Sequence, residues 1–131
     1  MNTIRLFSAL LIMLALRPAL NHTVWQNERQ EFVADAGNMT VTSTLEFVSA
    51  HKVVYHSKFV MPSHPAMYVN PDGTIDTIEG WTSEWDSNGT YKYRKGKLTI
   101  TLEDGETMEL VYRKGELVDI SYYTERIFRK K

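Results

Sequence analysis

Apolar and polar residues alternate along much of the chain with a period of two. Between residues 39 and 47, apolar side chains and a serine alternate with threonines and a glutamate. Successive side chains of a β-strand point to opposite faces, so this pattern predicts a strand with one buried face. Residues 53–61 form a second run of strand formers, preceded by a polar turn at residues 50–52 and ended by Pro62. We therefore expect a hairpin from these two runs.

Glycines punctuate the chain from residue 73 onward, and they separate β-branched and aromatic runs. Regular turn signals of this kind are typical of an antiparallel sandwich or barrel and leave no room for helices. The length of each turn fixes the register of its hairpin. We interpret Lys95-Gly96 as a two-residue turn, and Ser87-Asn88-Gly89, Asp104-Gly105-Glu106 and Lys114-Gly115-Glu116 as three-residue turns.

These turns predict one inward face that is rich in aromatic rings. It comprises Trp81, Trp85, Tyr91, Tyr93, Leu98, Ile100, Leu102, Met108, Leu110, Tyr112, Val118, Ile120 and Tyr122. The other face is polar, as a solvated face should be, and comprises Lys92, Arg94, Thr99, Thr101, Glu109 and Asp119. Residues 62–80 contain prolines and only short strand-like pieces, so we expect a mobile or rim segment there.

Short runs at residues 23–25 and 122–128 bring the expected number of strands to about eight. An open sheet of this size would leave two unpaired edges, whereas closure into a barrel removes them. The predicted fold is all-β: a single antiparallel up-and-down meander that closes into a short barrel. A β-sandwich is the alternative.

The first residues have the composition of an export signal. Arg5 precedes an uncharged apolar run from residue 6 to residue 16, which is shorter than the roughly 20 residues that span a bilayer. A buried N-terminal helix or strand is the alternative. We predict a signal peptide at residues 1–19, cleaved within residues 15–22, followed by one barrel domain at residues 20–131.

Charge and cysteine content narrow the class of protein further. The chain holds 15 basic and 16 acidic residues, and removal of the signal takes away Arg5 and Arg17 but no acid. The acidic balance of the mature domain argues against a nucleic-acid partner. The chain has no cysteine, so it has neither disulfides nor a lipid-modified cysteine. We expect a periplasmic or secreted product without a stable membrane anchor after cleavage.

Three segments carry a resemblance to a known group of proteins. They are residues 20–25 (Leu-Asn-His-Thr-Val-Trp), residues 44–47 and, above all, residues 89–102. With these segments in this order, the chain resembles the small lipocalin-like domains exported by gut bacteria of the Bacteroidetes type. Such domains usually begin with Leu-x-Gly-Thr-x-Trp, and here His22 stands in place of the glycine. The resemblance implies a short barrel and, by analogy with larger lipocalins, a small apolar ligand.

Catalytic or metal-binding patterns are not found. The four histidines fall on different predicted elements without the spacing of a zinc site, and paired acids such as Glu84 and Asp86 fall on the outer face. No nucleophile elbow, phosphate loop or dinucleotide fingerprint occurs. We therefore expect no cofactor, no metal and no enzymatic activity.

The leading hypothesis is a non-enzymatic exported barrel that binds a small hydrophobic or amphipathic molecule at one open end. The side chains expected to line that end are Trp81, Trp85, Tyr91, Tyr93 and Tyr112. A filled core with tyrosines at its mouth is the alternative for the same rings. The second hypothesis is a protein-interaction module or inhibitor with a solid core, whose contact surface is residues 62–80 with Met67 and Tyr68 exposed.

Overall fold

The computed structural model describes residues 19–121 and 123–131, which form strands and turns. Four strands are long, with 10 to 14 residues each: β1 (Thr23–Val33), β2 (Gly37–Phe47), β3 (Lys52–Met61) and β6 (Trp81–Arg94). Four are short, with 4 to 7 residues each: β7 (Lys97–Leu102), β8 (Thr107–Arg113), β9 (Glu116–Asp119) and β10 (Arg126–Lys130). The remaining two, β4 (His64–Pro65) and β5 (Thr77–Ile78), pair with each other.

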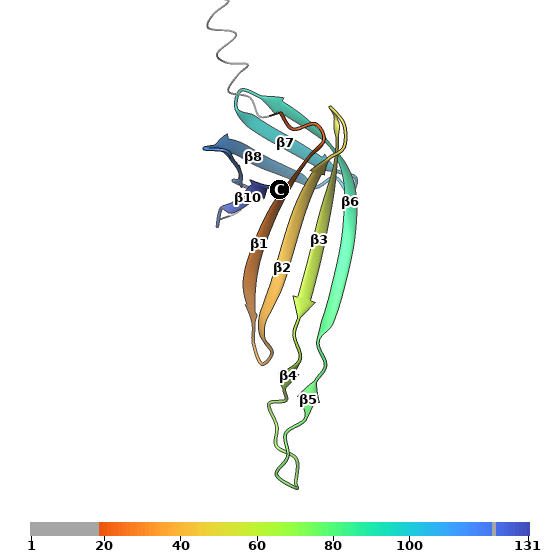
Figure 1. Cartoon of the computed structure of the whole chain (residues 1–131), viewed down its shortest axis with the longest axis vertical. Helices are drawn as coiled ribbons and strands as arrows, with labels where there is room; N and C mark the ends of the chain where they lie inside the picture. Colours follow the sequence, from red (N-terminus) through yellow and green to blue (C-terminus); the bar gives the residue numbers. More distant parts are fainter. Residues whose placement is uncertain (1–18, 122) are drawn as a thin grey trace, which may run out of the picture.

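The eight longer strands close into one antiparallel barrel in the order β1-β10-β9-β8-β7-β6-β3-β2 (Figure 1). This order is an up-and-down meander into which β4 and β5 are inserted, so the predicted fold class is confirmed. Tyr122 and nearly all of the predicted signal peptide lie outside the described residues. No helix long and apolar enough to cross a membrane occurs in the part of the chain that is described.

The difference in strand length makes the two ends of the barrel unlike each other. Where all eight strands pair, the interior is filled by fully buried side chains, the largest of which are Phe47, Phe128, Leu45, Leu98, Ile100, Leu110 and Leu117. At the other end the long strands run on beyond the short ones (Figure 1). The inner face of that extension therefore has no opposite wall to pack against.

Two of the predicted hairpins form as expected. Along β2, the side chains of Val41, Leu45 and Phe47 are fully buried, and Phe47 pairs with Val53 across the turn to β3. The Lys95-Gly96 turn has two residues with positive φ, of 54° and 79°. Positive φ at both positions matches the right-handed twist of the strands that such a turn joins.

The predicted turn at Ser87-Asn88-Gly89 is wrong, because β6 runs straight through it for 14 residues and pairs with β3 along its lower part. Gly89 is needed there for a different reason. A Cβ atom at Gly89 would lie 2.7 Å from the carbonyl oxygen of Thr101 on β7. The glycine permits a close approach of two strands rather than a reversal of the chain.

The register between β7 and β8 differs from the predicted one, but each side chain keeps its predicted face of the sheet. Ile100, and not Leu102, lies opposite Met108. This register differs from the predicted one by two residues, which is the period of side-chain alternation. Leu102 and Met108 therefore stay on the inner face, where both are buried.

The predicted turn between β8 and β9 is one residue too long. The side chains of β9 therefore lie on the opposite faces from those predicted. Lys114 and Gly115 form a two-residue turn with φ values of 50° and 79°, and Tyr112 lies opposite Leu117. Leu117 and Asp119 therefore occupy the inner face, and both are fully buried. Val118 lies on the other face although it is buried, and Ile120 is 37% exposed.

The first strand is longer than predicted. The apolar run ends at Trp25, but β1 continues to Val33 and pairs with β2 along its whole length. Alternate positions from Trp25 place Asn27, Arg29 and Glu31 on the inner face of the extension. Polar residues are tolerated there because these side chains are not buried: the first two are half-buried and Glu31 is exposed.

Residues 62–80 form an arm that projects from the barrel (Figure 1). It is a hairpin in its own right, with a hydrogen bond from Ala66 N to Asp76 O of 2.8 Å and one from Asn70 N to Thr74 O of 2.7 Å. The predicted rim segment is therefore an ordered extension of the β3–β6 hairpin.

We expect Gly89→Ala to lower the free energy of unfolding by about 1–3 kcal/mol, because the added methyl group must push β6 and β7 apart. Thr90→Ala, at the next and exposed position of β6, is the control and should change it little. Chemical denaturation of both variants measures the difference, and an unchanged midpoint for Gly89→Ala would contradict the close approach.

Candidate functional site

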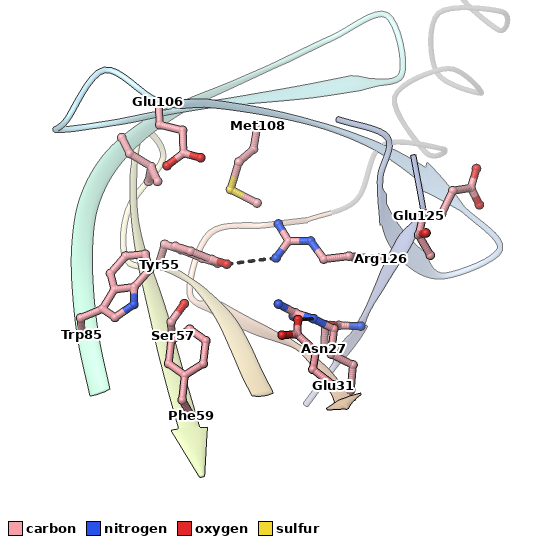
Figure 2. Close-up of a pocket in the computed structure, with 13 residues that line it drawn as sticks. Asn27, Glu31, Tyr55, Ser57, Phe59, Trp85, Glu106, Met108, Glu125 and Arg126 are labelled. Carbon is pink, nitrogen blue, oxygen red and sulfur yellow. Dashed lines mark hydrogen bonds and ion pairs between the residues drawn. The ribbon is translucent and has the colours of Figure 1, made fainter. Parts of the chain in front are cut away.

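A pocket of about 600 Å³ lies where the short strands end. Its walls come from the extensions of β1, β3 and β6, from the β7–β8 hairpin and from the start of β10 (Figure 2). The lining side chains are Asn27, Arg29, Glu31, Tyr55, Ser57, Phe59, Trp85, Leu102, Glu106, Met108, Thr124, Glu125 and Arg126. This volume lies within the range of small-molecule sites.

Three small side chains lie at this level of the barrel, and one of them, Ser57, lines the pocket. Ser43, Ser57 and Ser87, on the adjacent strands β2, β3 and β6, are all buried on the inner face. Ser43 lies directly opposite Ser57, and Ser87 lies opposite Tyr55. At the filled end the same faces of these strands carry larger apolar or aromatic side chains, so a serine at this level occupies less of the interior.

One side of the pocket is apolar. Phe59, Leu102 and Met108 line it together with Trp85, which is 43% exposed. The Trp85 ring stands edge-on to Tyr55, with 5.5 Å between the ring centroids. A half-exposed indole held in this way offers a fixed apolar wall to a ligand.

The other side is built on a buried ion pair. Asp119 is fully buried, and its Oδ2 accepts hydrogen bonds from Nε and Nη2 of Arg126, at 3.0 and 2.6 Å. Its Oδ1 accepts a third from the backbone N–H of Ser121, at 2.9 Å. Arg126 then donates from Nη1 to the hydroxyl oxygen of Tyr55 at 3.1 Å, so that the two side chains meet across the pocket (Figure 2).

Arg29 extends this polar network from β1. Its Nε donates to Glu31 Oε1 at 3.0 Å, and its Nη1 donates to Ser43 Oγ at 3.3 Å. Ser43 Oγ also accepts a hydrogen bond from the Tyr55 hydroxyl at 3.3 Å. Ser43 and Tyr55 therefore link the two guanidinium groups. No buried side-chain nitrogen or oxygen in residues 19–121 and 123–131 is left without a partner.

The network perturbs the ionisation of its members. Burial alone would raise the pKa of Tyr55, but hydrogen bonds with Ser43 and Ser57 and the charge of Arg126 outweigh it, so the pKa is lowered. Burial would likewise lower the pKa of Arg126, but Tyr55 and Asp119 raise it instead. Arg126 is thus held as a cation, and Tyr55 ionises more readily than an ordinary tyrosine.

Of the five predicted ligand-binding residues, the structure places one on this pocket, namely Trp85. Trp81 lies four positions further out on β6 and is 49% exposed. The three tyrosines belong to the filled end. Tyr91 donates to the carbonyl oxygen of Ser49 at 2.6 Å, and Tyr93 and Tyr112 pack against the core.

Sequence reasoning missed the polar side of the pocket. A three-residue turn at Lys114-Gly115-Glu116 places Asp119 on the solvent face. A two-residue Lys114-Gly115 turn, by analogy with Lys95-Gly96, places it on the inner face. Asn27 and Arg29 could have been found by extending the period of two beyond Trp25. Nothing in the sequence singled out Arg126.

The histidine with the most side-chain partners, His56, lies outside the pocket. His56 sits on the outer face of β3, where Nδ1 bonds Asp86 Oδ1 at 2.5 Å and Nε2 bonds Glu46 Oε2 at 3.1 Å. Partial burial would lower the pKa of His56, but these two carboxylates raise it. Among the residues described, no three His, Asp or Glu side chains are grouped so that they could hold a metal ion.

The fold and site thus define a closed antiparallel barrel with one filled end and one pocketed end. No protein-family model matches the chain, and no curated protein or solved structure is significantly similar to it. The resemblance to exported lipocalin-like domains stays a prediction from the sequence motifs.

We expect Tyr55 to ionise below the usual tyrosine pKa of 10.0. This ionisation should be absent from the titration of the Tyr55→Phe variant. In that interval the folded state binds fewer protons than the unfolded state, so this group's contribution to stability rises with pH and is lost as pH falls through the folded pKa. Ultraviolet titration of tyrosinate measures the ionisation. Arg126→Lys should keep the effect of the positive charge on the pKa of Tyr55, while Arg126→Gln should remove it and raise this pKa, with the hydrogen bonds with Ser43 and Ser57 still lowering it. A titration unchanged by Tyr55→Phe would contradict the assignment.

Proposed function

We propose that the protein is an exported, non-enzymatic binder of a small amphipathic molecule, and that the pocket between Trp85 and Arg126 is its binding site. The observation that carries the proposal is this pocket of about 600 Å³, open to solvent and lined on one side by apolar and on the other by polar groups. A pocket with an apolar wall and a few fixed polar groups is the usual form of a small-molecule site.

The arrangement of the walls favours an amphipathic ligand over a purely apolar one. A hydrocarbon portion would lie against Phe59, Leu102 and Met108, with Trp85 at the rim. A polar group would reach the Arg126–Tyr55 side, where the donors and acceptors are already held in place by the network. Preformed partners of this kind lower the entropic cost of binding.

Two features support binding rather than catalysis. The lining contains no histidine, and the chain has no cysteine, so the commonest general base and the thiol nucleophile are missing from the pocket wall. Arg126 is tied to a buried carboxylate, which suits a positioning role. The proposed location, the periplasm or the cell exterior, rests on the apolar run of residues 6–16.

A test uses the tryptophans as matched reporters. We expect decanamide, an uncharged amphiphile, added below its solubility limit, to change the intrinsic fluorescence of the protein with a saturable dose dependence. Trp85→Phe should remove most of this change, because Trp85 lines the pocket, whereas Trp81→Phe should keep it. Native mass spectrometry of protein isolated from its own compartment would then reveal the natural ligand as an added mass. A response that survives in Trp85→Phe and vanishes in Trp81→Phe would place binding elsewhere.

A second candidate function is supported by the arm at residues 62–80. Met67 is 75% exposed, and Tyr68, Val69 and Ile75 are also exposed. Pro65 and Met67 share a shallow hollow of about 380 Å³ with Phe32 from the tip of the β1–β2 hairpin. An ordered apolar projection of this kind is typical of a surface that binds another protein.

The charge of the arm indicates what such a partner would look like. Residues 62–80 contain Asp72, Asp76 and Glu79 and no lysine or arginine. The complementary partner is a protein with an apolar depression and a basic rim. An anionic membrane surface would instead repel the arm.

Replacement of residues 62–80 by Asn-Gly should leave the melting temperature within a few degrees of the wild-type value. Met61 and Trp81 are directly opposite each other, so a two-residue turn can join them, and β4 and β5 pair only with each other within the described chain. Thermal unfolding measures this, and an affinity pull-down with each form measures partner capture. The second candidate requires that capture be lost while the barrel stays folded; collapse of the barrel would count against it.

A further inference from the structure

Both guanidinium groups of the pocket are already neutralised by carboxylates of the same chain. Arg126 gives two hydrogen bonds to Oδ2 of Asp119, whose side chain is fully buried. Arg29 is paired with Glu31 at 3.0 Å. Neither arginine therefore presents an uncompensated positive charge to a ligand.

Two further carboxylates line the same space. Glu106 comes from the β7–β8 hairpin and Glu125 from the segment before β10. Glu125 is paired with Arg113 at 2.9 Å, and Glu106 is directed toward the pocket interior in Figure 2. The lining itself holds three carboxylates and two guanidinium groups. Carboxylates therefore outnumber guanidinium groups on the pocket wall.

A ligand with an anionic head group would meet these carboxylates at close range. To reach Arg29 it would have to displace Glu31, and to reach Arg126 it would have to compete with a buried carboxylate oxygen that already accepts two hydrogen bonds from this guanidinium. Like charges that approach each other at an interface oppose binding, and they do so more strongly where solvent is partly excluded. An uncharged hydroxyl, carbonyl or amide group avoids this repulsion and can still accept a hydrogen bond from a guanidinium that stays paired.

We infer that the pocket selects amphiphiles with an uncharged polar head group over their carboxylate counterparts, and that the Arg29–Glu31 pair is a main determinant of this choice. The inference rests on the proposed function, because it concerns the ligand of the same site. A pocket with two arginines would be expected to prefer an anionic ligand, and it is the carboxylates paired with them that reverse this expectation.

The experiment compares decanamide with decanoate, which share a chain length and differ by one negative charge at neutral pH. Decanamide should bind the wild-type protein about tenfold more tightly or better, measured by fluorescence titration and by calorimetry. Glu31→Gln should narrow or reverse the ratio, because it frees Arg29 from its carboxylate. Glu109→Gln, which removes an equally exposed and ion-paired carboxylate from the outer face, is the matched control and should leave the ratio unchanged.

Ionic strength supplies an independent readout. Because the preference arises from charge, raising the salt concentration should shrink the ratio in the wild-type protein. Equal or tighter binding of decanoate by the wild-type protein would overturn the inference while leaving the proposed function intact. So would a ratio that Glu31→Gln does not change. Binding of neither compound at the pocket would instead overturn the proposed function, and with it this inference.

Discussion

Every strand of a closed barrel needs a hydrogen-bonding partner on both edges, and strands of unequal length can meet that need only in part. β6 pairs with β3 from Trp81 to Thr90 but with β7 only from Gly89 onward. β1 pairs with β2 along its full length but with β10 at only two residues. The two uncovered edges flank the opening, and charged residues along them, such as Glu28 and Glu84, oppose pairing with another chain.

The polar network replaces the core that the short strands cannot supply. A buried Asp–Arg pair contributes little net stability, but loss of one partner leaves an isolated buried charge and costs about 3–5 kcal/mol. Asp119 and Arg126 come from the two strands that flank the β9–β10 turn, while Tyr55 and Ser43 come from the opposite wall. The network therefore holds the short and long halves of the barrel in one relative position, and it does so without filling the space between them.

The sequence predicts the fold well because the filled end obeys simple rules. Alternation along β2 and the Lys95-Gly96 turn are local signals, and each is decided by one physical term. Prediction fails where a contact between strands, rather than the local turn, decides which residue is needed. Gly89 looks like a turn residue but serves a close contact between strands, which no local signal reveals.

The site is harder to predict because it departs from the alternation that identifies a strand. Asn27, Arg29 and Glu31 are inward-facing and polar, so β1 loses its apolar signature where the pocket begins. Asp119 is a buried carboxylate whose partner, Arg126, lies beyond an irregular turn. Only Trp85 was predicted for the ligand site and also lines the pocket. The buried serines at this level, of which Ser57 lines the pocket, resemble ordinary polar residues in the sequence.

The seam between β1 and β10 is unlike every other junction in the barrel. The remaining strands pair with neighbours that follow them in the chain, so each closes a short loop, or in the case of β3 and β6 a loop that contains the arm. Across the seam, the side-chain amide of Asn27 bonds the carbonyl oxygen of Ile127, 100 positions away. Pairing of β1 with β10 closes the longest loop in the domain, so it carries the largest entropic cost of any strand pairing in the barrel. A chain that has formed all its hairpins but not this seam has no pocket, so a bound molecule would stabilise the closed barrel by mass action.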